Sequence, residues 1–290
     1  MPQNKWIAGA RPRTLPAAVA PVLVGTALRH IDHARVDLIN ALLALLVSLA
    51  LQVAVNYAND YSDGIRGTDE VRVGPIRLVG SGLASAAAVK NAALITFAFA
   101  GVCGLILSAR SSWWLVLVGA ISMIAAWFYT GGKSPYGYKG LGEISVFLFF
   151  GVVATVGSYV AQSRQITWQS ILVSIPVGLL ACALLAVNNL RDLPKDAVVG
   201  KKTMAVRLGD KNARVAFIAL LAIAHIAALA AIAISPWSAA TLLLLPTSFR
   251  ISRTIWAGAK GSELIPLLGE IGRLHLLLST TLAMALLAKR

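Results

Sequence analysis

Hydrophobic and polar positions segregate along this chain into long apolar runs joined by short polar links. Nine runs have about the 20 residues that a helix needs to cross a hydrocarbon core about 30 Å thick. They are 15–31, 38–59, 84–108, 112–130, 141–162, 168–190, 213–234, 237–257 and 264–288. Nine such runs in series are not expected of buried helices in a soluble protein. The pattern therefore predicts an all-α, polytopic membrane protein with nine transmembrane helices in one domain, residues 1–290.

Composition agrees with a membrane protein and gives the charge a meaning. Hydrophobic residues make up 58% of the chain and charged residues 13%, about half of the ~25% usual in soluble domains. The net charge of +14, from 26 Lys and Arg against 12 Asp and Glu, suggests at first a nucleic-acid partner. With the N-terminus in the cytoplasm, however, only six basic residues fall outside and 20 inside, as the positive-inside rule expects. We therefore predict a cytoplasmic N-terminus, an outer C-terminus and no nucleic-acid partner.

The second apolar run ends in an unusually polar segment, LQVAVNYANDYSDG, at residues 51–64. Asn56, Asp60 and Asp63 are spaced i, i+4 and i+7, so a helix would carry them on one face. Carboxylates on a membrane helix are expensive and usually face a cavity or a partner. This segment is a candidate site.

The sixth run ends in a similar way, in AVNNLRDLPKDAVVGKKTMAVRLG at residues 186–209. Asn188, Asp192 and Asp196 follow at i, i+4 and i+8, although Pro194 predicts that the helix kinks or stops there. The two motifs, 56–63 and 188–196, begin 132 residues apart, with four predicted helices between corresponding positions. This spacing suggests an internal four-helix pseudo-repeat with one extra helix.

Two sets of aspartates at one membrane face suit Mg²⁺, which takes oxygen ligands and is often held by one or two carboxylates plus substrate phosphates. Basic residues follow each set, and Lys and Arg neutralise phosphate oxygens. They are Arg66, Arg72 and Arg77 after the first set, and Lys195, Lys201, Lys202 and Arg207 after the second. The pattern favours a metal-assisted diphosphate clamp. The alternative is cytoplasmic loop charge that only sets orientation, with aspartates that cap or pair locally.

A third polar segment, YTGGKSPYGYKGLGE at 129–143, joins the fourth and fifth runs. Such a glycine-rich loop can fold over a site, and the aromatic faces of Tyr129 and Tyr138 can stabilise a cation. Lys133 and Lys139 add positive charge to the same loop. The alternative interpretation is an interfacial tyrosine belt of the kind that flanks many membrane spans.

With these motifs the chain resembles the UbiA superfamily of intramembrane prenyltransferases, whose pattern is N-x-x-x-D-x-x-x-D in the first motif and D-x-x-x-D in the second. Asp192 and Asp196 match the second motif, while Asn56 and Asp60 match the first. Gly64 stands at the third acidic position, and Asp63 would supply the missing carboxylate. The strings NYANDYSDGIRGTDEVRVGPIRLVGSG and NNLRDLPKDAVVGKKTMAVRLG look like the 1,4-dihydroxy-2-naphthoate prenyltransferase branch.

The resemblance implies a nine-helix UbiA-type bundle and assigns roles to these residues. Two Mg²⁺ ions would bridge the diphosphate, with metal ligands Asn56, Asp60, Asp63, Asp192 and Asp196. Catalysis would add Tyr129 and Tyr138, which stabilise an allylic cation, to the four aspartates. The substrate-binding set would be Asn56, Arg66, Arg72, Arg77, Lys133, Lys139, Asn188, Lys201 and Arg207, in which Lys133 or Lys139 would pair with the acceptor carboxylate. Arg11 and Arg13 would help to close the site.

The implied activity transfers a polyprenyl group from polyprenyl diphosphate to 1,4-dihydroxy-2-naphthoate with decarboxylation, giving demethylmenaquinone in a bacterial cytoplasmic membrane with the site toward the cytoplasm. Another aromatic acceptor, such as 4-hydroxybenzoate or homogentisate, remains an alternative. A cation-coupled transporter is a second alternative, but its acids would normally lie near the midplane. A CDP-alcohol phosphotransferase is disfavoured because its Asp-Gly-x-x-Ala-Arg motif is missing after Asp63-Gly64.

Overall fold

The computed structural model describes residues 4–32, 35–67 and 76–289, and all regular structure in these ranges is helical. The α-helices are α1 (Lys5–Ala10), α2 (Pro16–Leu28), α3 (Leu38–Ile65), α4 (Ala86–Arg110), α5 (Trp114–Thr130), α6 (Gly142–Val146), α7 (Ala154–Ser163), α8 (Trp168–Val198), α9 (Met204–Ala230), α10 (Leu245–Trp256) and α11 (Leu264–Leu287). Short 3₁₀ segments connect several of them: η1 (Pro12–Thr14), η2 (Arg29–Asp32), η3 (Tyr136–Lys139), η5 (Ala231–Ala233), η6 (Pro236–Leu244) and η7 (Gly261–Glu263). A π-helical stretch, η4 (Phe147–Val153), joins α6 to α7.

Each of the nine predicted apolar runs coincides with helical structure, so the all-helical membrane prediction is confirmed in outline. Within the described residues, six helices are long and apolar enough to cross a membrane, and a seventh span arises if the pair 5–14 and 16–32, bent by 51°, is taken as one. The segment Trp114–Thr130 is apolar but shorter, at 17 residues. The segment 236–256 divides into η6 and α10. Multi-pass architecture is therefore shown, whereas nine crossings stay a prediction.

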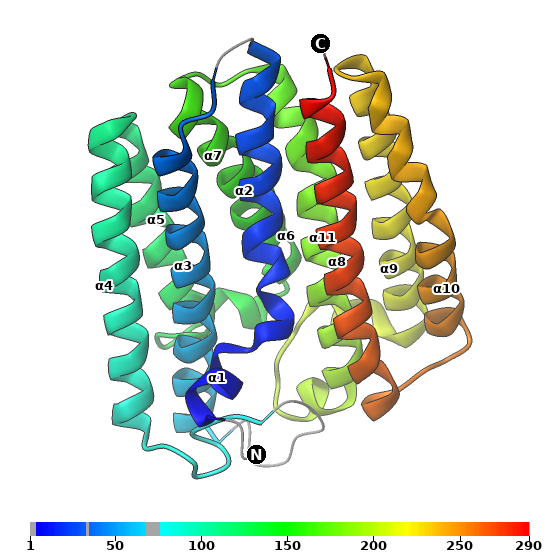
Figure 1. Cartoon of the computed structure of the whole chain (residues 1–290). Coiled ribbons are helices and arrows are strands. Elements are labelled where there is room, and N and C mark those ends of the chain that lie inside the picture. The colour runs from blue at the N-terminus through cyan, green and yellow to red at the C-terminus, as the bar shows by residue number, and fades with distance from the viewer. Residues whose placement is uncertain (1–3, 33–34, 68–75, 290) are drawn as a thin grey trace.

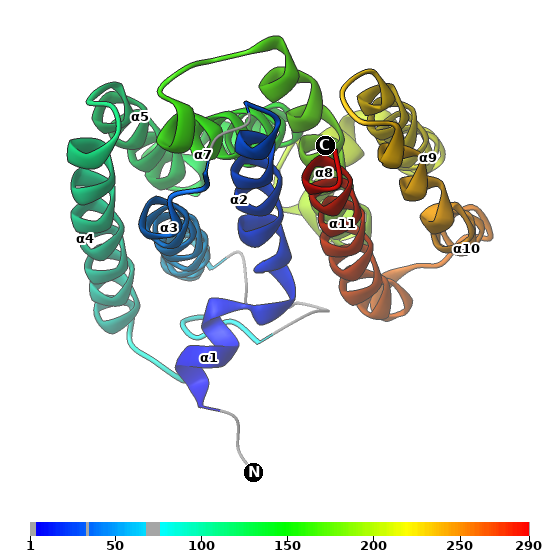
Figure 2. The ribbon, with the colours of Figure 1, turned by 45° about the horizontal axis from the view of Figure 1, so that its top comes forward.

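The helices run side by side in one bundle, with α1 lying across one end of it (Figure 1). Helices α3, α4 and α5 form one side, α9 and α10 form the other, and α2, α8 and α11 stand between them in both views (Figures 1 and 2). Helix α11 finishes at the end opposite to α1 (Figure 1). The bundle therefore has two distinct ends, of which one carries α1 and the motif-bearing ends of α3 and α8.

Glycines allow two close contacts between helices of the bundle. In a membrane the hydrophobic effect does not drive helices together, because lipid tails are as apolar as the side chains, so close packing decides helix association. A Cβ on Gly25 of α2 would lie 2.3 Å from the Thr155 carbonyl oxygen of α7. A Cβ on Gly151 of η4 would lie 2.5 Å from the Cα of Gly178 in α8. Side chains at these positions would push the helices apart, so the glycines fix the spacing of α2, α7 and α8.

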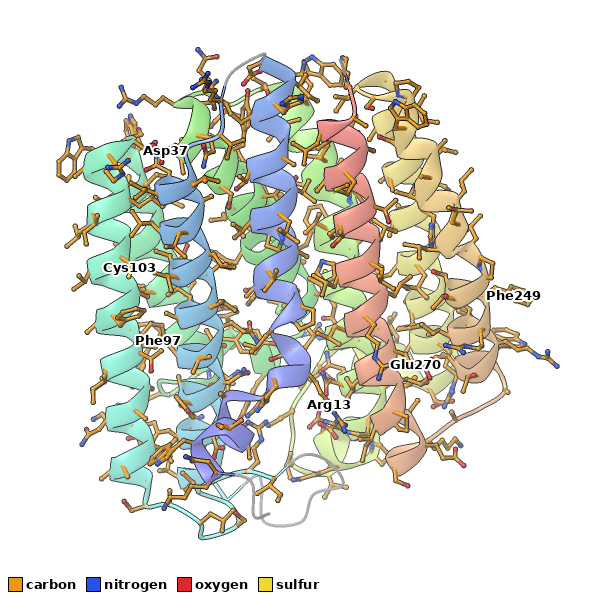
Figure 3. All side chains as sticks on the ribbon, viewed as in Figure 1. Arg13, Asp37, Phe97, Cys103, Phe249 and Glu270 are labelled. Atoms are coloured by element: carbon orange, nitrogen blue, oxygen red, sulfur yellow. The ribbon has the colours of Figure 1, made fainter. Side chains whose placement is uncertain are left out.

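The end opposite to α1 is fastened by a polar network that joins α3, α4 and α7. Arg110 donates from Nη2 to Asp37 Oδ2 at 3.0 Å and from Nε to Asn40 Oδ1 at 2.8 Å. The backbone of Asp37 exchanges two hydrogen bonds with the Gln162 side chain, at 2.8 and 2.9 Å. Figure 3 shows Asp37 at this end and Arg13 toward the other. The chemistry-bearing motifs lie at Arg13's end.

The two motif helices extend beyond their predicted apolar runs, 38–59 and 168–190. Helix α3 continues to Ile65, so the whole first motif is helical. Helix α8 runs through Pro194 to Val198, so of the two outcomes predicted at the proline, a kink or a stop, the helix does not stop there. Proline removes one backbone hydrogen bond of the helix, and α8 tolerates this loss within its last turns. Continuous helices carry the aspartates of both motifs into one region.

Candidate active site

The two Asp-bearing helix ends enclose a polar cavity of about 570 Å³, which we call the polar cavity. The wall is completed by α1 and η1, the loop before α4, the link after α8 and residues 129–143, which we call the tyrosine loop. Its polar and charged lining consists of Arg11, Arg13, Thr14, Asn59, Asp63, Arg77, Tyr129, Thr130, Tyr138, Asn188, Asn189, Asp192, Lys195, Asp196, Lys201 and Thr203. Five of these side chains are basic and three are acidic, so the described wall favours an anionic ligand.

A second, mostly apolar cavity of about 470 Å³ lies between α3, α4, α5 and the η4–α7 helix, and we call it the apolar cleft. It reaches from Asn59 to Ala44 along α3. At 1.5 Å per residue this is ~22 Å, most of a hydrocarbon core ~30 Å thick. Residues that line both cavities include Arg11, Thr14, Asn59, Tyr129 and Asn188. The polar cavity and the apolar cleft are therefore neighbours that share a wall.

Asp63 is a carboxylate of the polar cavity with cationic and hydrogen-bonding partners from several segments. Its side chain is buried, and its Oδ1 accepts a hydrogen bond from the Tyr138 hydroxyl and lies 3.3 Å from Lys201 Nζ. Arg77 Nη2 lies 3.6 Å from Oδ2. Residues from three segments thus converge on one carboxylate, because a buried charge needs charged or hydrogen-bonding partners.

Charge and burial set the protonation states of the groups around Asp63. Burial and the nearby Asp63 carboxylate raise the pKa of Tyr138 above its ordinary value. Burial opposes the charge of Lys201, but Asp63, Tyr138 and Asp196 outweigh it, so the pKa of Lys201 is raised as well. The Lys201 ammonium also lies 4.3 Å from the centre of the Tyr138 ring. At neutral pH the hydroxyl is therefore protonated and the lysine is charged.

The second motif contributes Asp192 and Asp196 from consecutive turns of α8. Arg191 holds Asp192 with two hydrogen bonds, from Nε at 2.7 Å and from Nη2 at 2.6 Å. Such a two-point contact fixes the orientation of a carboxylate as well as its charge. The backbone N–H of Lys201 donates to the carbonyl oxygen of Asp196 at 2.9 Å, which folds the link after α8 back over the helix end.

Two residues of the first motif do not line the polar cavity. Asp60 is fully buried, and its two oxygens accept the backbone N–H groups of Leu78 and Val79 at 2.8 and 3.1 Å. It fastens the segment that carries Arg77. Asn56 lines the apolar cleft instead, and its Nδ2 donates to the Ala10 carbonyl oxygen at 2.9 Å.

Only some of the basic residues predicted in the loops line the polar cavity. Arg77 and Lys201 line the polar cavity, whereas Arg66, Lys133, Lys139 and Arg207 do not. Arg66 donates to the carbonyl oxygens of Thr130 and Gly132, and Arg207 donates to those of Lys139 and Lys202. These two arginines hold the tyrosine loop in place over the site. Arg72 lies outside the described residues.

Tyr129 and Tyr138 both line the polar cavity, as the sequence suggested, but in different surroundings. Tyr129 also lines the apolar cleft, and its ring packs edge-to-face on that of Tyr136 with 5.5 Å between centroids. The Tyr129 ring thus stands where the two cavities meet.

Several polar residues of the walls were absent from the sequence prediction. Asn59 and Asn189 line the polar cavity, and Asn189 donates to Glu143 Oε1 at 2.9 Å. Thr14 lines both cavities, and Gln52 lines the apolar cleft. Gln52 stands four residues before Asn56, so its position on the motif face of α3 is visible in the sequence.

The donor set of the polar cavity fits Mg²⁺ bound together with phosphate. Asp63, Asp192 and Asp196 offer carboxylate oxygens, and Asn59 and Asn188 offer amide oxygens, which are the ligands that Mg²⁺ prefers. No group of three or more His, Cys, Asp or Glu side chains within residues 4–32, 35–67 and 76–289 forms a metal cage by itself. Mg²⁺ is commonly held by one or two carboxylates plus substrate phosphates. The wall suits that mode.

Comparison with known proteins gives consistent matches over most of the chain. A model of the UbiA prenyltransferase family matches residues 18–265. The 1,4-dihydroxy-2-naphthoate octaprenyltransferase of Mycobacterium tuberculosis is 46% identical over 282 residues, covering 97% of this chain and 96% of the relative. The protein of the same name from Haemophilus influenzae is 37% identical, covering 97% and 95%. A solved UbiA homolog from Archaeoglobus fulgidus, bound to DMAPP and Mg²⁺, has a TM-score of 0.71 at 16% identity and covers 99% of this chain and all of its own.

Proposed function

The chain belongs to the UbiA prenyltransferase family, and on that premise we propose that it transfers a polyprenyl group from polyprenyl diphosphate to 1,4-dihydroxy-2-naphthoate. The acceptor loses its carboxylate as CO₂, and the product is the quinol form of demethylmenaquinone. Relatives named 1,4-dihydroxy-2-naphthoate octaprenyltransferase support this choice of acceptor.

One observation carries the proposal: an acid- and base-lined polar cavity shares a wall with a long apolar cleft. A polyprenyl diphosphate has the same division, with a highly charged head and a long hydrocarbon tail. The diphosphate would lie between the motif ends of α3 and α8. The tail would extend along the cleft toward Ala44.

Helix glycines give the cleft its width. Gly101, Gly104, Gly119 and Gly157 all line it, and a Cβ at any of them would meet almost nothing, the closest atom being 3.9 Å away at Gly104. Glycine in a helix interior costs about 1 kcal/mol relative to alanine, and no tight packing explains it here. Space for a branched tail does.

The head group would be bound by the cationic wall. Arg77 and Lys201 are held by Asp63 and face the same cavity, so they can neutralise phosphate oxygens without moving far. Mg²⁺, held by Asp63 on one side and by Asp192 and Asp196 on the other, would supply further charge neutralisation as the diphosphate leaves. The family resemblance suggests two such ions.

In the reaction the C1–O bond of the prenyl diphosphate breaks and its electron pair leaves with the diphosphate. The basic groups stabilise this developing charge, which is commonly the largest catalytic contribution. The electron-rich face of Tyr129, at the junction of the cavities, can stabilise the allylic cation left on C1. A ring carbon of the acceptor then bonds to C1, and the carboxylate departs as CO₂ while its bonding electrons stay with the ring.

The topology completes the proposal. Nine crossings would put the N-terminus and the polar cavity on the cytoplasmic side of a bacterial cytoplasmic membrane, with the C-terminus outside. The excess of basic residues around the motif end supports this orientation. The lipid would deliver the polyprenyl donor laterally to the cleft.

The test is a product assay with purified protein, Mg²⁺ and geranylgeranyl diphosphate, offered 1,4-dihydroxy-2-naphthoate or 4-hydroxybenzoate in separate reactions. We expect a prenylated, decarboxylated naphthalenediol by mass spectrometry and no prenylated benzoate. Turnover of the benzoate alone would overturn the choice of acceptor. Uptake of a cation without any prenylated product would favour the transporter alternative.

A further inference from the structure

Gln52 is a buried polar side chain with no role in the chemistry described so far. It lies in α3, one turn deeper in the membrane than Asn56, and its side chain is 6% exposed. It forms part of the wall of the apolar cleft. A primary amide in such surroundings costs free energy unless its N–H and C=O groups are both hydrogen-bonded.

Thr14 fixes which way this amide faces. Gln52 Nε2 donates to Thr14 Oγ1 at 2.8 Å, and Asn56 Nδ2 donates to the same oxygen at 3.1 Å. The Thr14 hydroxyl itself donates a hydrogen bond to the Arg11 carbonyl oxygen at 2.9 Å. A hydroxyl has one proton and two lone pairs, so Thr14 has no donor left. Gln52 must therefore turn its N–H group, not its oxygen, toward Thr14.

The other half of the amide is left without a partner. Gln52 Oε1 is buried, and it accepts no hydrogen bond from any residue that the structure describes. The Thr14 that anchors it lines both the polar cavity and the apolar cleft. The unmatched oxygen therefore lies near the junction of the two cavities, where the donor's C1 and the acceptor ring have to meet.

The chemistry of the two proposed substrates decides which of them can match this oxygen. A hydrocarbon tail has no hydrogen-bond donor, and diphosphate oxygens at neutral pH are acceptors that a carbonyl oxygen repels. A dihydroxy-aromatic acid has two phenolic O–H groups. We propose that Gln52 Oε1 accepts a hydrogen bond from a ring hydroxyl of the aromatic acceptor and so determines which acceptors bind.

This assignment rests on the proposed function and deepens it. It makes the reduced state of the acceptor part of recognition, because the corresponding quinone has carbonyl oxygens in place of both hydroxyls. A site built to bind a hydroxyl rejects analogues that lack it more strongly than an apolar pocket does. Acceptors with a hydroxyl at the matched ring position are therefore favoured.

The test measures binding without turnover. The protein is loaded with Mg²⁺ and farnesyl thiodiphosphate, an unreactive donor analogue, under reducing conditions. Dissociation constants are then measured for 1,4-dihydroxy-2-naphthoate and for 1-hydroxy- and 4-hydroxy-2-naphthoate, each of which lacks one hydroxyl. Gln52→Met removes the oxygen at nearly constant size. Gln162→Met, at the opposite end of the bundle, is the matched control.

In the unaltered protein, one of the two monohydroxy compounds should bind about tenfold more weakly than the dihydroxy compound, the effect of one hydrogen bond. In Gln52→Met the dihydroxy compound should weaken by about the same factor, so that this difference disappears. Affinity for farnesyl thiodiphosphate should be unchanged, and Gln162→Met should keep the full difference. Persistence of the difference in Gln52→Met would overturn the proposal, since Gln52 would then act only by anchoring Thr14.

If Gln52→Met does not fold, Gln52→Asn provides the same comparison, because it keeps an amide but withdraws its oxygen by one methylene. Retained discrimination in that variant would likewise refute the proposal. Failure of the proposed function gives a different result: neither the unaltered protein nor any variant at position 52 would bind or prenylate 1,4-dihydroxy-2-naphthoate.

Discussion

The apolar cleft permits a prediction in which the length of the donor tail decides the outcome. Gly119 of α5 lines the cleft, and a Cβ there would meet no atom within 4 Å. Thr130, on the same helix, lines the polar cavity 11 residues away, which corresponds to ~16 Å along the helix axis. The change Gly119→Leu therefore fills space deep in the cleft and leaves the polar cavity untouched.

The expected effect depends on whether the prenyl tail of the donor is long enough to reach Gly119. From the bridging diphosphate oxygen to the end of a dimethylallyl group there are four bonds of about 1.5 Å, so the group extends at most ~6 Å and stops far short of Gly119. A geranylgeranyl group, four times as long, reaches that level. Because the geranylgeranyl tail enters the cleft from lipid and not from water, the substitution weakens its binding only through poorer packing in the cleft. Overpacking costs typically 1–3 kcal/mol, which is roughly a 5- to 150-fold fall in kcat/KM.

The assay compares kcat/KM for dimethylallyl and geranylgeranyl diphosphate with one acceptor. Gly119→Leu should leave the short donor within about twofold and reduce the long one by the factor above. Leucine is also the better helix former by almost 1 kcal/mol, so loss of folding is not expected. Gly269→Leu in α11 is the control, because its Cβ is equally unobstructed and it lines neither cavity. Equal losses for both donors, or none for either, would refute the placement of the tail.

Three further predictions concern the site and the packing around it. Asp63→Asn should lower kcat about 100-fold, the usual effect of removing one preorganised electrostatic group, and raise the Mg²⁺ concentration for half-maximal rate; a normal rate and Mg²⁺ dependence would remove Asp63 from the metal set. Because the pKa values of Lys201 and Tyr138 are raised, Lys201 stays charged and its ion pair with Asp63 is lost only as pH rises through a value above 10.5. Farnesyl thiodiphosphate affinity should therefore show no step from these groups between pH 6 and 9.5, and a step that Lys201→Met abolishes would contradict this. Gly25→Val should lower the thermal unfolding temperature by several degrees, since its Cβ would meet the Thr155 carbonyl at 2.3 Å; an unchanged temperature would show that α2 and α7 can separate freely.

Much of the fold was predictable because membrane helices are set by apolar length, which a sequence shows directly. The limits of α4 and α11 differ from the predicted runs by only a few residues. The less accurate predictions fall where other forces act. Pro194 was expected to kink or stop α8, and the helix continues to Val198, because one missing backbone hydrogen bond does not end a helix that is packed on its neighbours. The internal pseudo-repeat stays a prediction.

The candidate site was predictable as a region but not atom by atom. Helical spacing put Asp60 and Asp63 on one face of α3, and both are buried. Only the tertiary structure shows that Asp60 bonds the backbone of Leu78 and Val79 while Asp63 faces the polar cavity. Loop cations were harder still, because Arg66 and Arg207 satisfy backbone carbonyls that no sequence pattern identifies. The sequence shows that Gln52 lies one helical turn before Asn56, but only the structure shows its hydrogen bond to Thr14 and its place in the wall of the apolar cleft.

The central claim is that the polar cavity and the apolar cleft together perform one decarboxylating prenyl transfer. The most direct measurement supplies the protein with Mg²⁺, geranylgeranyl diphosphate and 1,4-dihydroxy-2-naphthoate labelled with ¹³C in its carboxyl group, and follows all three products. The account predicts that labelled CO₂, diphosphate and the prenylated naphthalenediol form in equal amounts. Diphosphate released without labelled CO₂, or a prenylated product that keeps its labelled carboxylate, would contradict it.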